Sequence, residues 1–156
     1  MTRHTLSILV DNEAGVLSQV TRLFSRKGYN IESLAVGVTE DHSISRITVE
    51  VLADDRHVDL LCNQLQKLLC VHKVVQLNNA LRRELVMVKV ANQEIGKVIE
   101  KFDGKIIDKS DKCCIIEFVG DDACVEEVEK MLSPFGIVEL VRTGMIALER
   151  DGGNNG

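Results

Sequence analysis

The sequence is poor in several features that would point to a particular class of protein. Its 156 residues include one Pro, no Trp and 3% aromatic side chains, so long helices and strands can form with few large aromatic anchors. The formal net charge is −5, which argues against a protein that binds nucleic acid by neutralising phosphates. The first apolar run is short, is interrupted by Ser7 and is closed by a charge. It predicts neither a secretory signal nor a membrane span, and we expect a cytoplasmic protein.

The cysteines form no recognisable ligand or disulfide pattern. Their number is odd, no Cys-x-x-Cys pair occurs, and four of the five fall within apolar stretches, where a free thiol behaves as a small hydrophobe. This favours reduced thiols in a cytosolic protein. A zinc site is the alternative, but the four histidines show no ligand spacing with the cysteines. The cysteines are Cys62, Cys70, Cys113, Cys114 and Cys124.

Hydrophobic periodicity is the strongest structural signal, and it changes between period two and period 3.6 along the first half of the chain. Leu6, Ile8 and Val10 alternate as in a strand, whereas Val16, Val20 and Phe24 recur at helical spacing. Gly28 then suits the left-handed residue that ends a helix. The expected order is strand 4–10, helix 16–27, strand 31–39, a strand around 46–51, a helix after Asp54–Asp55 and strand 71–77.

The second half repeats this order, with strand 85–90, a short helix from Ile95, a hairpin of 105–109 and 113–119, a helix after Asp121–Asp122 and a last strand 137–148 bent at Gly144. We therefore predict an α+β protein of two tandem ferredoxin-like βαββαβ units. The predicted domains are residues 1–79 and 80–150, followed by a disordered tail, 151–156.

Each unit should place both helices on one face of an antiparallel sheet and leave the other face open. In the first unit that open face carries Thr5, Ser7, Thr48 and Glu50, which is consistent with solvent exposure or with a polar partner surface. Open sheet edges promote association unless they are covered. We therefore expect edges or faces to pair in a homodimer or larger assembly.

Little in the sequence supports catalysis. It contains no Ser/His/Asp arrangement, no phosphate-binding loop of the P-loop type and no His-rich metal motif. The acidic pairs Asp54–Asp55 and Asp121–Asp122 stand at predicted helix starts, where a carboxylate complements the helix dipole. We therefore predict no catalytic residues, no metal ligands and no cofactor in this chain.

Two polar segments flank the first predicted helix and form the candidate binding site. Asn12-Glu13-Ala14-Gly15 precedes the helix, whose N-terminal N–H groups suit a carboxylate. Asn30 and Ile31 follow it. An asparagine both donates and accepts, so Asn12 and Asn30 suit the polar groups of an amino acid. Spacing alone leaves open the alternative that Asn12 caps the helix while Gly28 and Asn30 only turn the chain.

A resemblance favours the first interpretation. The segment that carries it reads LSILVDNEAGVLSQVTRLFSRKGYNIESLAVG and resembles the N-terminal ACT domain of the small subunit of acetohydroxyacid synthase. Further similar segments are SRITVEV, QKLLCVHKVVQLNN, RELVMVKV, GKIID and VRTGMIAL. They cover roughly residues 3–150 in the family's order. The stretches N-E-x-G-x-L-S and F-S-x-K-G-Y-N-I-E-S-L are specific to this family rather than to ACT domains in general.

The resemblance implies a non-catalytic regulatory subunit in branched-chain amino acid biosynthesis. Its partner would be a catalytic subunit that carries thiamine diphosphate, magnesium and FAD. The chain would activate that subunit and confer feedback inhibition by valine or another branched-chain amino acid, bound between two ACT domains. One chain would contribute Asn12, Gly15, Val16 and Leu17, and its neighbour Asn30 and Ile31. The N–H groups of residues 15–17 would face the effector carboxylate, and Ile31 its apolar side chain.

The stretch VANQEIGKVIEKFDG between Val90 and Gly104 is shorter than in many relatives of this family, which affects the connection after the first strand of the second domain. Two other classes of function remain as alternatives. A transcriptional regulator with an ACT-like sensor would need a helix-turn-helix or a basic patch. An acyl-phosphate hydrolase on a ferredoxin-like scaffold would need an anion-clamping arginine, whereas Arg22 and Arg26 fall on the polar face of the predicted helix. Fold alone does not separate these classes.

Overall fold

A computed structural model of the chain describes residues 1–91 and 94–151. These residues form two compact units, and each is described separately. Unit 1 comprises Met1–Leu81 together with the chain from Met145 onward, and unit 2 comprises Arg82–Gly144.

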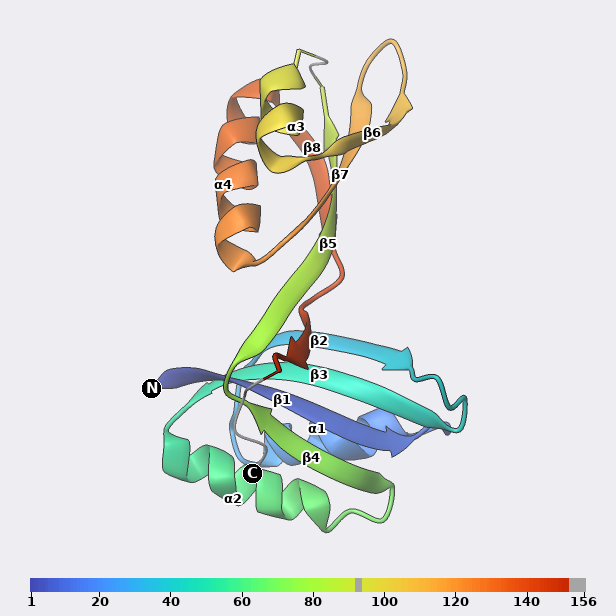
Figure 1. The fold of residues 1–156 in the computed structure, drawn as a ribbon, viewed down its shortest axis with the longest axis vertical. Helices are drawn as coiled ribbons and strands as arrows, with labels where there is room; N and C mark the ends of the chain where they lie inside the picture. Colours follow the sequence, from blue (N-terminus) through green and yellow to red (C-terminus); the bar gives the residue numbers. More distant parts are fainter. Residues whose placement is uncertain (92–93, 152–156) are drawn as a thin grey trace. The chain divides into compact units, whose positions relative to one another are not determined.

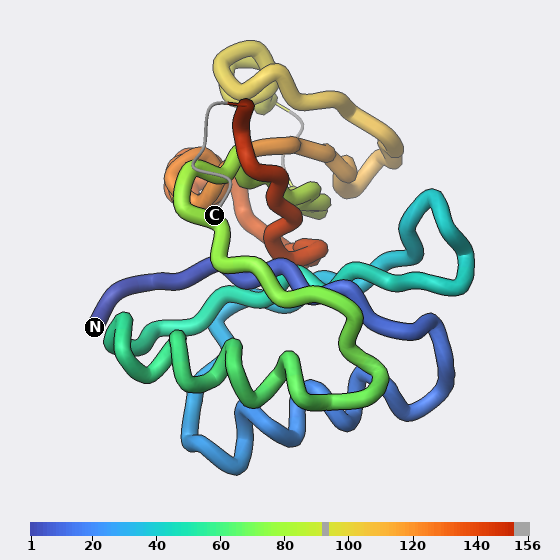
Figure 2. Tube along the Cα trace, turned by 60° about the horizontal axis from the view of Figure 1, so that its bottom comes forward, coloured from blue at the N-terminus to red at the C-terminus, as the bar shows by residue number. Residues whose placement is uncertain are grey.

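Unit 1 is the first of the two predicted βαββαβ units, and its order confirms the prediction. Its four-stranded antiparallel sheet has the order β2-β3-β1-β4, so β2 and β4 are the edge strands. Both helices lie on one face of this sheet (Figures 1 and 2). The elements are β1 (Thr2–Asp11), α1 (Val16–Arg26), β2 (Ile31–Val38), β3 (Ile44–Ala53), α2 (Asp55–Gln66) and β4 (Val71–Leu77).

The core of unit 1 follows from the two periodicities in the sequence. Leu6, Ile8 and Val10 of β1 point to the helices and are at most 2% exposed. From α1, Val20 and Phe24 pack against them in one continuous cluster. Burying such side chains contributes about 1.5–3 kcal/mol each, which makes this layer the main stabilising element of the unit.

The opposite face of the sheet differs from expectation. Thr5, Ser7, Thr48 and Glu50 are at most 8% exposed, so the first of the two alternatives for this face, solvent exposure, is wrong for these side chains. Glu50 accepts a hydrogen bond from the Thr5 hydroxyl at 2.9 Å. The end of the chain returns to this face as β9 (Ile146–Glu149), as Figure 1 shows. A buried polar layer under the chain's own C-terminal segment was not visible in local sequence patterns.

Unit 2 repeats the layout, which confirms the second predicted βαββαβ unit. Its sheet order is β6-β7-β5-β8, and β9 pairs with β5. Val86, Val88, Ile116 and Phe118 form its core with the helices. The elements are β5 (Ala80–Val90), α3 (Gly96–Phe102), β6 (Lys105–Lys109), β7 (Cys114–Gly120), α4 (Asp122–Leu132), a 3-10 turn (Ser133–Phe135) and β8 (Ile137–Arg142).

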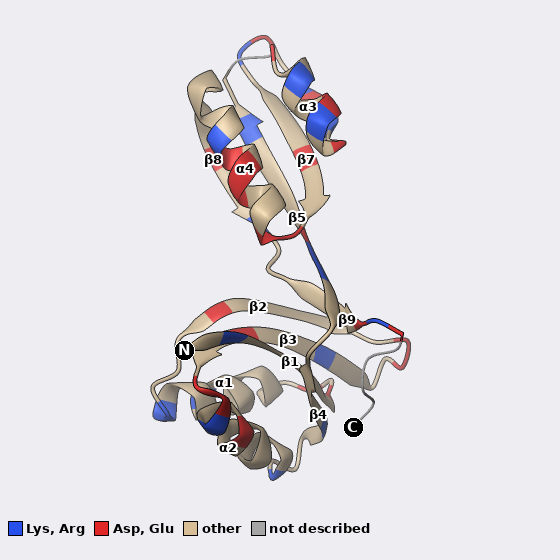
Figure 3. Cartoon of the chain, turned by 60° about the vertical axis from the view of Figure 1, so that its left-hand side comes forward, with Lys and Arg blue, Asp and Glu red and all other residues tan. Residues whose placement is uncertain are grey.

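The acidic pairs stand at helix starts, as predicted. The Asp121 carboxylate accepts a hydrogen bond from the Cys124 N–H at 3.0 Å and so caps α4. Asp54 occupies the equivalent position before α2 without a side-chain capping bond. Figure 3 marks acidic residues at both helix starts. The structure therefore gives these carboxylates a structural role.

The domain boundaries differ from the expected 1–79 and 80–150. The predicted last strand 137–148 is divided into β8 and β9, because Gly144 adopts a positive φ of 87°. The chain leaves unit 2 at this glycine, and Met145 already belongs to unit 1. Of the predicted disordered tail, residues 152–156 lie outside the described part of the chain.

Candidate effector-binding site

The N-terminus of α1 presents backbone N–H groups that the described chain leaves available. Gly15 is the N-cap residue, with φ 85°, and no side chain caps the helix. The Val16 N–H makes a long bond of 3.4 Å to Glu13 O, and within residues 1–91 and 94–151 no backbone acceptor is found for the N–H groups of Leu17 and Ser18. The first turn contains no acidic residue. Such an uncapped helix end favours a bound carboxylate.

Asn12 lies beside this helix end but does not cap it, which removes one alternative left open by the sequence. Its side-chain amide donates to the carbonyl oxygen of His42 at 2.9 Å, and its backbone N–H donates to Ser43 O at 2.8 Å. Both bonds tie the loop after β1 to the turn before β3. They fix the side chain while leaving its Oδ1 oxygen able to accept, for example from an ammonium group.

Asn30 and Ile31 lie at the other end of α1, after the two residues whose hydrogen bonds end the helix. Gly28, with φ 74°, donates to Ser25 O at 3.1 Å, and the Tyr29 N–H donates to Phe24 O at 3.0 Å. These two bonds form the Schellman motif, so the predicted role of Gly28 as a left-handed cap is confirmed. The Asn30 amide donates to Glu32 Oε1 at 3.3 Å, which orients it on the surface.

A single chain does not bring the two halves of the predicted site together. Asn12, Gly15 and Leu17 are exposed at the start of α1, and Asn30 is exposed beyond its end. The helix between them has 11 residues. At 1.5 Å per residue it separates the two groups by ~16 Å, more than an amino acid can span. A site that uses both groups therefore requires two copies of the chain.

Sequence reasoning missed Ser33, which lies two residues after Ile31. Its hydroxyl oxygen accepts the Met145 N–H at 2.8 Å, across 112 positions of sequence. No local signal could have indicated the partner, because it comes from the end of the chain.

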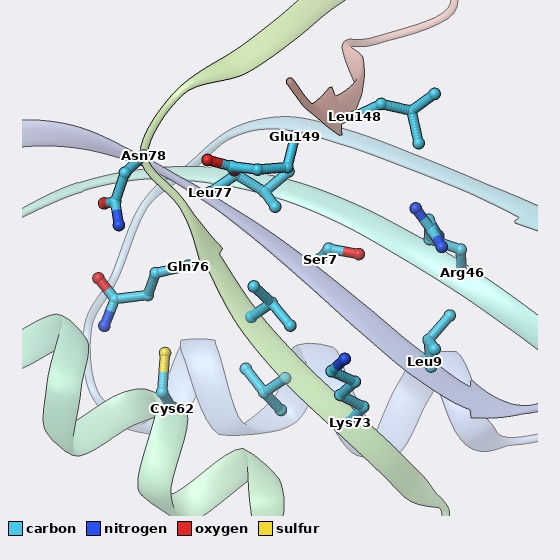
Figure 4. Close-up of a pocket in the computed structure, with 12 residues that line it drawn as sticks. Ser7, Leu9, Arg46, Cys62, Lys73, Gln76, Leu77, Asn78, Leu148 and Glu149 are labelled. Atoms are coloured by element: carbon cyan, nitrogen blue, oxygen red, sulfur yellow. The ribbon is translucent and has the colours of Figure 1, made fainter. Parts of the chain in front are cut away.

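A separate hollow of about 720 Å³ lies along β4 and includes none of the predicted effector residues. Figure 4 shows Arg46 and Lys73 toward one end and Glu149 with Asn78 toward the other. Glu149 Oε1 accepts the Asn79 N–H at 2.9 Å. Its Oε2 atom is buried, and no hydrogen-bond partner for it occurs in the described residues. The hollow is therefore an alternative binding place with a different lining, and a binding experiment can distinguish it from the candidate site.

Four of the five thiols are poorly suited to nucleophilic chemistry. Burial, with a smaller contribution from the Asp59 carboxylate, raises the pKa of Cys62 to about 11. Burial also raises the pKa of Cys70, Cys114 and Cys124. Because the thiolate is the reactive form, these groups are largely unreactive near neutral pH. All five cysteines are free thiols.

Within residues 1–91 and 94–151, no group of three or more His, Cys, Asp or Glu side chains is placed to hold a metal ion. Over the same part of the chain, no helix combines the length and the apolar character needed to cross a membrane.

Comparison with known proteins agrees with the fold and identifies the family. A profile of the ACT domain of acetohydroxyacid synthase small subunits matches residues 6–73, and a profile of the small subunit of acetolactate synthase matches residues 83–151. The acetolactate synthase small subunit of Mycobacterium leprae is 40% identical over 154 residues, which cover 94% of this chain and 91% of the relative. That of Aquifex aeolicus is 38% identical, covering 96% and 82%.

A solved structure supports the same conclusion. The acetolactate synthase small subunit of Thermotoga maritima matches with a TM-score of 0.91 and 37% identity, covering 96% of this chain and 98% of that one. The order of elements, both profiles and these relatives agree along nearly the whole sequence. The chain belongs to the family of acetolactate synthase small subunits, and its N-terminal unit is the ACT domain of that family.

Proposed function

We propose that this chain is a non-catalytic regulatory subunit. It activates the catalytic subunit of acetohydroxyacid synthase and confers feedback inhibition by a branched-chain amino acid, most simply valine. Thiamine diphosphate, magnesium and FAD belong to the catalytic subunit. The observation that carries the proposal is the uncapped N-terminus of α1 beside Asn12, which offers N–H donors to an effector carboxylate.

The binding free energy expected for a carboxylate at this helix end is of the size that a sensor with millimolar affinity for its metabolite needs. The dipole contributes about 0.3–2 kcal/mol to a carboxylate held there, and charge-assisted hydrogen bonds add to it. A millimolar ligand needs only about 4 kcal/mol in total. Feedback then requires the effector to prefer one state of the complex, and coupling energies of about 1–3 kcal/mol are typical.

The second half of the site comes from a homodimer, and the two edges of the unit 1 sheet indicate how it forms. The β4 edge is blocked, because the Gln66 side chain accepts from the Val74 N–H at 3.1 Å and donates to His72 O at 3.4 Å. The β2 edge carries exposed Val36 and Val38 at 48% and 55%. An apolar edge strand is a template for pairing. We place the dimer contact at β2, which begins with Ile31.

We also place the chain in the cytoplasm. Its five cysteines are all free thiols, a state that a reducing compartment maintains.

Sedimentation should detect a dimer or a larger assembly at micromolar concentration. Replacing both Val36 and Val38 by Lys should shift the protein toward monomer, because charges on an edge strand oppose strand pairing. Leu60→Lys is the matched control, since Leu60 is 53% exposed on α2 of the same unit and should leave the assembly intact. A wild-type monomer would contradict the proposal.

Activity measurements test the regulatory role directly. The isolated chain should form no acetolactate, and its addition to the matching catalytic subunit should raise turnover until the two are stoichiometric. Valine should then inhibit the reconstituted enzyme more strongly than the catalytic subunit alone. An unchanged rate at saturating amounts of this chain would contradict the activating role.

Gly15→Asp should abolish feedback while leaving activation in place. The new carboxylate would lie within a few ångströms of the effector carboxylate, and such like charges repel by about 4 kcal/mol at an effective dielectric of 20. Because Gly15 has φ 85°, any side chain adds backbone strain there. Gly15→Asn is the matched control, since it has nearly the same shape and strain without the charge.

Calorimetry with valine, beside inhibition curves of the reconstituted enzyme, separates the two Gly15 variants. The Asp variant should lose at least about a hundredfold in affinity relative to the Asn variant, given the size of the repulsion. Equal affinities in the two variants would show that the effector carboxylate binds elsewhere.

A further inference from the structure

The strand that carries half of the proposed effector site is irregular at that point. The pairing of β2 with β3 shifts register between Ile31 and Ser33, which marks a β-bulge at Glu32. A bulge bends its strand and re-aims the neighbouring side chains. The direction in which Asn30 and Ile31 face therefore depends on what holds this bulge.

The residue after the bulge is held by the C-terminal segment Met145–Glu149, the C-terminal strap. The Met145 N–H donates to Ser33 Oγ at 2.8 Å, and Met145 is 1% exposed. Ala147 is also buried, at 5%. The strap lies on the sheet face opposite the helices, as Figure 1 shows for β9.

The far end of the strap is anchored as well. Glu149 Oε1 accepts the Asn79 N–H at 2.9 Å, and the Arg150 N–H donates to Asn79 O at 2.9 Å. These bonds fix the strap to the segment after β4. The strap is thus tied at one end beside the effector strand and at the other end beside the opposite edge of the sheet.

We propose that Ser33 is a positioning residue of the effector site, and that its hydrogen bond to the strap holds the β2 bulge in the conformation that binds effector. This inference rests on the proposed effector function. Without the hydroxyl, the Met145 N–H loses its acceptor, so the strap loosens and the bulge can relax. Coupling is reciprocal, so an effector that orders Asn30 and Ile31 also tightens the strap.

Three variants of the full-length chain test this role by calorimetry with valine. Ser33→Ala removes the acceptor and should weaken valine binding about tenfold. Ser33→Thr retains the hydroxyl in a residue that suits a strand, and should stay within about twofold of wild type. Ser7→Ala is the matched control, because Ser7 is 7% exposed on the same sheet and its substitution should leave affinity unchanged.

Amide hydrogen exchange at Met145 supplies a readout that affinity alone does not give. Ser33→Ala should speed exchange at Met145, and valine should slow that exchange in wild type.

The two proposals fail in different ways. If wild type binds no valine, leucine or isoleucine even when assembled with its catalytic subunit, the effector function is wrong and the role of Ser33 falls with it. If wild type binds valine but Ser33→Ala binds it equally while Met145 exchange rises, only the positioning role is overturned. Weak binding in both Ser33→Ala and Ser33→Thr, with native affinity in Ser7→Ala, would also overturn it, because the hydroxyl would not be the cause.

Discussion

The effector binding proposed for this chain depends on an uncapped helix N-terminus, that of α1. The first N–H groups of α1 can serve a ligand only because neither Asn12 nor any other side chain of the helix end accepts from them. Asn12 instead donates to His42 O and is held by that bond. A structural loop would normally satisfy such a helix end with its own Ser, Thr, Asp or Asn. Leaving it open costs stability that a bound carboxylate can restore.

The same helix explains why the proposed site needs two chains. Its 11 residues keep Gly15 and Asn30 at opposite ends, so one chain presents the two groups of the proposed site apart from each other. The two edge strands of the unit 1 sheet also differ. The Gln66 side chain hydrogen-bonds to the backbone of β4, whereas β2 carries the exposed side chains of Val36 and Val38. In the proposed dimer, association through β2 would complete the site and cover an exposed apolar edge at the same time.

Local patterns predicted much of the fold and little of its long-range detail. The alternation of Leu6, Ile8 and Val10 and the left-handed stop at Gly28 depend on near neighbours, and both were predicted correctly. The burial of Glu50 and the bond from Met145 to Ser33 depend on segments far apart in sequence, and no periodicity encodes them. The positions of the half-sites followed from the resemblance, because asparagine and glycine at turns are otherwise unspecific.

In the regulatory function that we propose, a carboxylate binds the N-terminus of α1 opposite Asn30 of a second copy. A valine titration of the isotope-labelled protein, monitored through its backbone amide resonances, tests this directly. The largest shifts should fall on Leu17 and Ser18, with smaller ones on Asn30 and Ile31. Shifts confined to the hollow around Lys73 and Glu149, with the α1 amides unchanged at saturation, would contradict it.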